Sequence, residues 1–258
     1  MSTGAFFASA WHWNTWITFA CGALAGAYFT AEGFRDWRRA LLWVLGVLLI
    51  LLAFVSPFGV LADGYLFSGH MARHILLLLI VPALLLCARP GGLATRRRFG
   101  NLPHKPWVAW IMGIGTMAFW HVPAVFHIAM RTPVLHIVEP ISLLIAGTLY
   151  WWPVLGPAPV RLPAVPDAAA YLFASCLACT VMGIFITFAP PVYGGYAHSH
   201  DAYGILPLIR EQWGISPAVD QQIGGLLMWV PCCLIYLTAI MAMFARWYGE
   251  EHRASAEA

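Results

Sequence analysis

Long apolar stretches are the feature that most constrains what this chain can fold into. About 20 apolar residues, each rising roughly 1.5 Å along a helix, cross the hydrocarbon core of a bilayer. Of the 258 residues, 61% are hydrophobic and 10% are charged, whereas a soluble domain is about 25% charged. We therefore predict an all-α integral membrane protein, a single domain over 1–258 with seven transmembrane helices at about 13–30, 40–62, 68–88, 107–130, 134–153, 168–189 and 223–247.

Two features complete the predicted organisation. The N-terminal stretch has no basic region and no small-residue cleavage site before the first apolar run, which predicts no removable signal peptide. The segment of about 190–222 is the one long connection between predicted spans, and its length is typical of a functional or re-entrant element. Within it we expect a short amphipathic helix around Leu206–Trp213.

The positions of lysine and arginine predict the orientation in the membrane. Eleven of the fourteen lie in the first, third and fifth connections or at the C-terminal end, and only Arg73, Arg131 and Arg210 lie on the other side. Positive residues stay on the cytoplasmic side, so we expect a multi-pass membrane protein with the N-terminus outside and the C-terminus in the cytoplasm. The net charge of +3 is a topology signal. It does not predict nucleic-acid binding, because no basic patch carries interleaved aromatic residues.

The histidines have the opposite distribution. Eight of the ten gather toward the predicted outer face, namely His12, His70, His74, His121, His127, His136, His198 and His200. Acidic residues, among them Asp63, Glu139 and Asp220, lie toward the same face. Ionisable residues within membrane spans are candidates for function by default.

The pattern "HMARH" predicts a metal-binding pair. His70 and His74 are four residues apart and share one helix face, and Pro123 disturbs the helix beside His121. Imidazole suits copper and zinc, and thioether sulfur favours Cu(I). Our candidate ligands are His70, His74, His121, Met71, Asp220 and Met228, with weaker candidates His127, His136, His198, His200, Cys176 and Cys179.

Each candidate also has a purely structural explanation. Polar side chains in membrane bundles commonly bridge helices, a carboxylate such as Asp220 suits a helix N-terminus, and Arg73 can form an ion pair with Asp220 or Glu139. The six cysteines lie within predicted spans, where a free thiol behaves as a small hydrophobe. They do not predict a disulfide framework.

The order of five motifs resembles the polytopic CtaG family of bacterial cytochrome c oxidase assembly factors, which is unrelated to the single-span copper chaperone of the same name. The motifs, spread over a resemblance of about 13–247, are "HMARHILLLLIVPALLLCARP", "FWHVPAVFH", "LYWWPVLGP", "PPVYGGYA" and "WGISPAVDQQIGGLLMWVP". The motif positions are His70, Met71, His74, Trp120, His121, Pro123, Trp151, Trp152, Pro153, Tyr193, Asp220, Gln221, Gln222, Gly225, Met228 and Trp229.

The resemblance implies a seven-span fold, a location in the bacterial inner (plasma) membrane and a role in maturing a haem–copper oxidase through copper supply. Together with the histidines, it leads us to expect a non-enzymatic metallochaperone. This protein would hold Cu(I) near the outer face and pass it to the catalytic subunit, with periplasmic copper chaperones as candidate further partners. The connection carrying "HSHDAYGILPLIREQ", with His198 and His200, is longer than the family usually has, and we interpret 198–212 as a capture or docking device.

Three other functions stay open on the sequence. A haem-binding redox protein would pair His70 or His74 with His121 or His136, because two histidines on one helix face cannot clamp both sides of one haem. A metal-free scaffold would bind oxidase subunits through its helical surface. A copper transporter would use Cys176, Cys179 and Cys232 as sites within the membrane.

Overall fold

The structure, a computed structural model, describes residues 2–33, 35–89, 105–157, 161–162, 164–193, 196 and 201–256, most of which are helical. No strand occurs among these residues. The helices are α1 (Thr3–Ser9), α2 (Thr15–Glu32), α3 (Trp37–Val55), α4 (Pro57–Gly64), α5 (Phe67–Ile75), η1 (Leu76–Ile80), α6 (Val81–Ala88), α8 (Pro106–Trp120), α9 (Pro123–Arg131), α10 (Pro133–Leu155), α11 (Val165–Phe188), η5 (Leu208–Gln212) and α12 (Pro217–Ala256).

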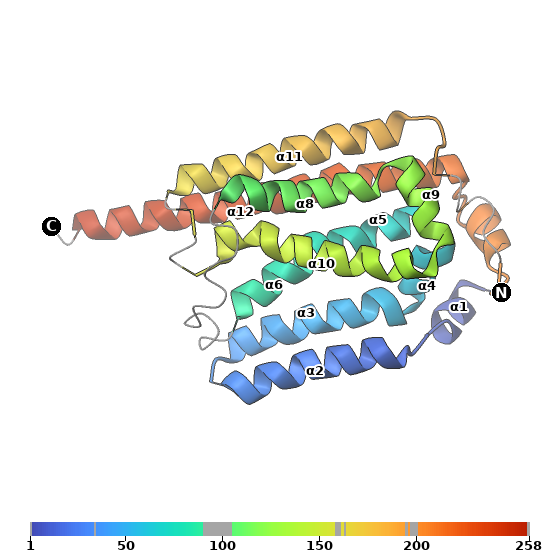
Figure 1. The fold of residues 1–258 in the computed structure, drawn as a ribbon, viewed down its shortest axis with the longest axis horizontal. Coiled ribbons are helices and arrows are strands. Elements are labelled where there is room, and N and C mark those ends of the chain that lie inside the picture. Colours follow the sequence, from blue (N-terminus) through green and yellow to red (C-terminus); the bar gives the residue numbers. More distant parts are fainter. Residues whose placement is uncertain are drawn as a thin grey trace.

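Most long helices are apolar enough to cross a membrane. Five candidate spans qualify by length and composition among the described residues: Trp37–Val55, Phe67–Ala88, Pro133–Leu155, Val165–Phe188 and Pro217–Glu250. A sixth arises if α8 and α9, which are bent by 71° at their junction, count as one span. The predicted span 13–30 corresponds to α2, which packs beside α3 (Figure 1) but is not among the qualifying helices. The seven-span count and the orientation therefore stay predictions.

Two predicted spans are broken at prolines. The predicted 40–62 helix ends at Val55, because Ser56 is extended ahead of Pro57, which starts α4. A proline ring disfavours the helical conformation at the residue that precedes it. The predicted 107–130 helix is interrupted at His121 and Val122, ahead of Pro123. Both breaks turn short helices across one end of the bundle.

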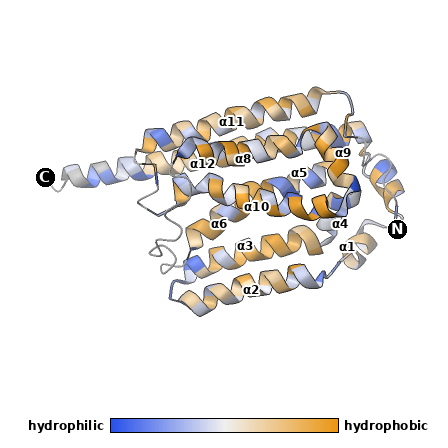
Figure 2. Ribbon diagram, in the orientation of Figure 1, coloured by the Kyte–Doolittle hydropathy of each residue, from blue (hydrophilic) through white to orange (hydrophobic). Residues whose placement is uncertain are grey.

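The helices form an elongated bundle with the two termini at opposite ends (Figure 1). Helices α2 and α3 lie along one side, and α11 and α12 lie side by side on the other (Figure 1). The end that carries the N-terminus, called the N-terminal end here, also holds α1, α4 and α9. Figure 2 shows hydrophobic residues along the lengths of the helices, as expected for helices surrounded by lipid.

The span Phe67–Ala88 runs through the middle of the bundle and changes helix type along its length. It is α-helical up to Ile75, π-helical over Leu76–Ile80 and α-helical again from Val81. Pro82 has no N–H to give the Leu78 carbonyl, and π-helical turns are frequent at functional sites. A Cβ atom on Gly147 would lie 2.2 Å from that carbonyl oxygen. Only glycine lets α10 approach the span this closely.

The long connection at the N-terminal end carries a short helical turn, η5, which confirms the helix predicted around Leu206–Trp213. Ile205, Leu208 and Ile209 are buried there against Phe6 and Leu61. The connection is therefore packed onto α1 and α4. His198 and His200 lie outside the described residues.

Candidate metal centre

His70 and His74 face one another in the central span. Their ring centroids are 4.3 Å apart, and the two residues are 1% and 3% exposed. The prediction that they share a helix face is confirmed, since residues four apart lie one above the other on an α-helix.

Glu139 of α10 joins the two histidines. Its Oε1 atom lies 3.0 Å from Nε2 of His70 and 3.0 Å from Nε2 of His74. One ligand atom from each of the three residues lies within 4.8 Å of the other two, and Glu139 is 2% exposed. Gly147 positions this carboxylate, because the close approach of α10 lies about two helical turns further along the same helix.

Sequence reasoning did not include Glu139 among the ligands. It placed the residue among the acidic groups of the outer face and offered it as a partner for Arg73. The sequence did contain a signal for Glu139, because a carboxylate inside an apolar span needs a partner. The histidines near the same face were candidate partners. The choice of partner, however, depends on which helices are neighbours.

The hydrogen bonds fix how the imidazoles are protonated. A guanidinium group only donates, and Nη2 of Arg73 lies 3.4 Å from Nδ1 of His70. His70 therefore carries its proton on Nε2 and donates it to Glu139. Nδ1 of His74 is buried and has no hydrogen-bond partner among the described residues. The centre thus contains one buried nitrogen that can accept a further ligand or proton.

His121 adds a second pair of potential ligand atoms next to this cluster. Its Nδ1 lies 2.6 Å from the Met117 carbonyl oxygen, and its Nε2 lies 3.0 Å from Sδ of Met71. Because a carbonyl only accepts, the ring proton of a neutral His121 is on Nδ1, and Nε2 turns a lone pair toward the sulfur. The ring centroid of His121 is 5.2 Å from that of His74. The structure therefore places the His121 ring beside that of His74, and the Met71 sulfur beside His121.

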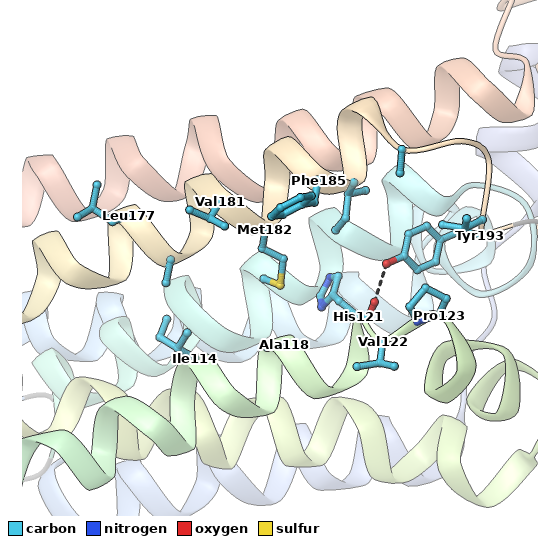
Figure 3. A pocket seen from close by; sticks show the side chains of 14 residues that line it. Ile114, Ala118, His121, Val122, Pro123, Leu177, Val181, Met182, Phe185 and Tyr193 are labelled. Atoms are coloured by element: carbon cyan, nitrogen blue, oxygen red, sulfur yellow. Dashed lines mark hydrogen bonds between the residues drawn. The ribbon is translucent and has the colours of Figure 1, made fainter.

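A cavity of about 700 Å³ reaches His121 from between α8 and α11. Its wall is almost entirely apolar, with Val181 and Phe185 contributed by α11 (Figure 3). Tyr193 also lines this cavity, and it donates a hydrogen bond of 2.6 Å to the His121 carbonyl (Figure 3). The backbone of His121 is therefore held while its ring points into the bundle.

An ion pair lies beside the cluster at the N-terminal end. Arg73, 2% exposed, pairs with Asp63 of α4, and Nε2 of His136 lies 3.3 Å from Oδ1 of the same carboxylate. This corrects the expected partner of Arg73, which was Asp220 or Glu139. Partial burial raises the pKa of Asp63, but the His136 hydrogen bond and the Arg73 charge lower that pKa by more, and the net direction is down.

The carboxylate of Asp220 contacts the start of α5. It accepts hydrogen bonds from the backbone N–H of Phe67 at 2.7 Å, the backbone N–H of Ser68 at 3.0 Å and the Ser68 hydroxyl at 2.6 Å. Neighbouring Gln221 bonds the backbone at the end of α11 and beyond. Asp220 therefore fixes α12 to the start of the helix that carries the histidines, whereas Gln221 fixes α12 to the end of α11.

The remaining candidates make other contacts. Met228 is fully buried in the apolar core. Nε2 of His127 donates to the Val192 carbonyl at 2.9 Å. Cys176 and Cys179 lie on α11, where their thiols face cysteines of α12.

The fold and the site together define a class: a polytopic helical membrane protein with a buried histidine–glutamate cluster near one end of its bundle. Residues 27–250 match the sequence profile of the cytochrome c oxidase caa3 assembly factor (Caa3_CtaG) family. The chain belongs to this family. The resemblance inferred from the motifs is thereby confirmed.

Curated relatives extend beyond the length of this chain. An uncharacterized protein of Mycobacterium leprae is 27% identical over 93% of this chain and 39% of its own length. Uncharacterized proteins of Mycobacterium bovis and Mycobacterium tuberculosis are each 28% identical, with the same coverage. The chain spans about two fifths of the length of these relatives. No solved structure matches it.

Proposed function

We propose that this assembly factor holds Cu(I) at the cluster of His70, His74 and Glu139 and transfers it to the catalytic subunit of a haem–copper oxidase. The observation that carries the proposal is the convergence of both imidazoles on one carboxylate oxygen. Copper is cargo here, and the chain performs no chemical conversion. On the predicted orientation, the cluster lies toward the outer side of a bacterial inner membrane, where periplasmic copper chaperones could supply the metal.

Charge supports a monovalent cation. Two neutral imidazoles, each with its ring proton moved from Nε2 to Nδ1 so that Nε2 can bind the metal, and one carboxylate give a ligand set of net charge −1, which a Cu(I) ion neutralises. A divalent ion would leave an uncompensated positive charge next to Arg73, and a buried unpaired charge is strongly unfavourable. The cluster as built thus favours a monovalent ion.

The neighbouring pair of His121 and Met71 supports the choice of Cu(I) and a route for transfer. Imidazole nitrogen and thioether sulfur are both ligands for Cu(I), and here two such atoms lie 3.0 Å apart. His121 also lines the cavity between α8 and α11. We infer that copper moves between the cluster and the partner subunit through this pair.

Copper content of the purified chain tests the proposal. Full-length protein is loaded anaerobically with Cu(I), passed through a desalting column and analysed for metal. We expect the His70→Ala/His74→Ala variant to lose about one equivalent relative to the unmodified chain, because it lacks both imidazoles. His127→Ala is the matched control, since His127 bonds only a backbone carbonyl. Equal copper in all three proteins would overturn the proposal.

A metal-free scaffold is the second candidate, and a specific observation favours it. The Glu139 oxygen already accepts hydrogen bonds from both imidazoles, an arrangement that also holds α10 against α5 without metal. This candidate predicts that His70→Gln/His74→Gln retains association with oxidase subunits and supports oxidase assembly in cells. The copper site predicts folded protein that fails to support assembly.

A further inference from the structure

Four thiols face one another between α11 and α12, away from the histidine cluster. Sγ of Cys176 lies 2.6 Å from Sγ of Cys233, and the thiols of Cys179 and Cys232 are in hydrogen-bond contact. All four are free cysteines. Helices α11 and α12 run side by side (Figure 1), so each pair is made by one residue from each helix.

The interface that carries the thiols is closely packed. A Cβ atom on Gly225 would lie 2.3 Å from Oγ1 of Thr187, and one on Gly183 would lie 2.7 Å from the Trp229 ring. Small residues of this kind let membrane helices approach closely. The two glycines therefore fix the register that places Cys176 opposite Cys233.

The pair of Cys176 and Cys233 has a polar neighbour and is less buried than the other pair. Thr180 donates its hydroxyl proton to the Cys176 carbonyl at 2.8 Å, and its Oγ1 lies 3.2 Å from Sγ of Cys233. The hydroxyl oxygen can thus accept a hydrogen bond from the Cys233 S–H in the resting state. Cys233 is half-buried, whereas Cys179 and Cys232 are 0% and 1% exposed. The pair of Cys176 and Cys233 is therefore more accessible to a metal ion than the pair of Cys179 and Cys232.

The geometry distinguishes between metals. Zinc in structural sites takes four ligands in a tetrahedron, and iron–sulfur clusters also take four cysteines. Among the described residues, the four thiols do not form a group whose ligand atoms all lie within 4.8 Å of one another. Two facing thiols suit a soft cation that accepts two ligands, and thiolates select Cu(I) among the biological candidates.

We propose that Cys176 and Cys233 form a second Cu(I) site in the interface of α11 and α12, separate from the histidine cluster. Binding replaces one S–H proton with the metal, so that a thiolate, a thiol and Cu(I) together carry no net charge. The released proton goes to solvent, and no electron is transferred. A neutral complex is favoured because the surroundings are apolar. The site does not depend on copper binding by His70 and His74.

X-ray absorption on the full chain tests this site. The background is His70→Ala/His74→Ala protein loaded anaerobically with Cu(I), so that failure of the histidine cluster and failure of the thiol pair are seen separately. We expect this protein to retain about one equivalent of copper with sulfur scattering. Adding Cys176→Ser/Cys233→Ser should reduce the retained copper about tenfold or more, which corresponds to at least about 1.4 kcal/mol.

Matched thiol variants control for adventitious binding. Cys21→Ser/Cys87→Ser and Cys179→Ser/Cys232→Ser, each in the same background, should retain the copper. An equal loss in either control would overturn the proposal, and so would unchanged copper in the Cys176→Ser/Cys233→Ser protein. A Cys176–Cys233 disulfide in the anaerobically isolated chain, detected by mass spectrometry without reduction, would also overturn it.

Alkylation of the unmodified chain tests the site without a variant that could misfold. A small membrane-permeant alkylating reagent is applied with and without Cu(I), and each cysteine is quantified by mass spectrometry. We expect Cu(I) to slow modification of Cys233 several-fold while leaving exposed Cys87 unchanged. Equal protection of Cys87 and Cys233 would show non-specific binding and overturn the assignment.

Discussion

The histidine cluster and the thiol pair are built in different ways. The histidine cluster combines side chains from α5 and α10 and contains a carboxylate beside a buried arginine. The thiol pair comes from one helix interface, and its nearest polar neighbour is the neutral Thr180. The first has its negative charge in place before a cation arrives, whereas the second acquires charge only by releasing a proton. The two proposed copper sites thus differ in the source of the negative charge that would bind the cation.

The largest expected difference between the two regions follows from removing the carboxylate. Glu139→Gln keeps the size of the side chain and removes the charge that both imidazoles contact, and we expect the Cu(I) affinity of the histidine cluster to fall about 100-fold. Sulfur-bound copper should stay unchanged. Competition with a chromophoric Cu(I) chelator measures both. Asp167→Asn, an acid at the start of α11, is the control, and equal affinities for both variants would contradict the electrostatic design.

A second comparison uses the close helix contacts. Gly147→Ala places a Cβ against the Leu78 carbonyl, and we expect it to lower the free energy of unfolding by about 3 kcal/mol and to weaken the histidine cluster alone. Thermal unfolding in detergent measures the first effect and copper content the second. Gly115→Ala, where a Cβ would meet Ile111 at an ordinary 3.7 Å, should be neutral.

The matching substitution in the interface of α11 and α12 is Gly225→Ala. Gly225→Ala should separate α11 from α12 and lower copper at the thiol pair while sparing the histidine cluster. If either glycine variant weakened both sites equally, the two sites would not be independent.

A smaller effect is expected from Met71→Leu. Leucine replaces methionine with nearly the same volume, so we expect the free energy of unfolding to change by less than about 1.5 kcal/mol. Loss of the thioether should weaken Cu(I) binding about tenfold, which corresponds to about 1.4 kcal/mol. Met228→Leu, a buried methionine of the apolar core, should leave binding unchanged. If the Met71→Leu protein bound Cu(I) with unaltered affinity, the Met71 sulfur would not be a copper ligand on the transfer route.

The smallest effect concerns Asp63, at the edge of the histidine cluster. Its pKa is lowered in the folded chain from the ordinary value of 3.8. The stabilisation is therefore complete above that value and is lost as the pH falls through the lower, folded pKa. We expect Asp63→Asn to cost less than about 1 kcal/mol at neutral pH, because the carboxylate is half-exposed and the asparagine amide oxygen can still accept a hydrogen bond from Arg73. Unfolding curves should show the stability difference between the two proteins shrinking as the pH falls below 3.8.

The sequence predicted the helices of the bundle well where the apolar pattern was continuous. The expected spans 68–88 and 134–153 correspond closely to Phe67–Ala88 and Pro133–Leu155. The sequence predicted the helix ends less well near Pro57 and Pro123, where apolar residues continue through a break in the helix. Hydropathy does not register such a break, although the proline itself signals it.

What the sequence by itself determined is local: the membrane class, the family motifs and the shared face of His70 and His74, which follows from helical period alone. Only the tertiary structure decided that Glu139 contacts both imidazoles, that Arg73 pairs with Asp63, and that Cys176 meets Cys233. These contacts join residues 10 to 69 positions apart. Close helix packing at Gly147 and Gly225 allows the first and the last of these contacts, and no single-helix periodicity specifies which helices become neighbours.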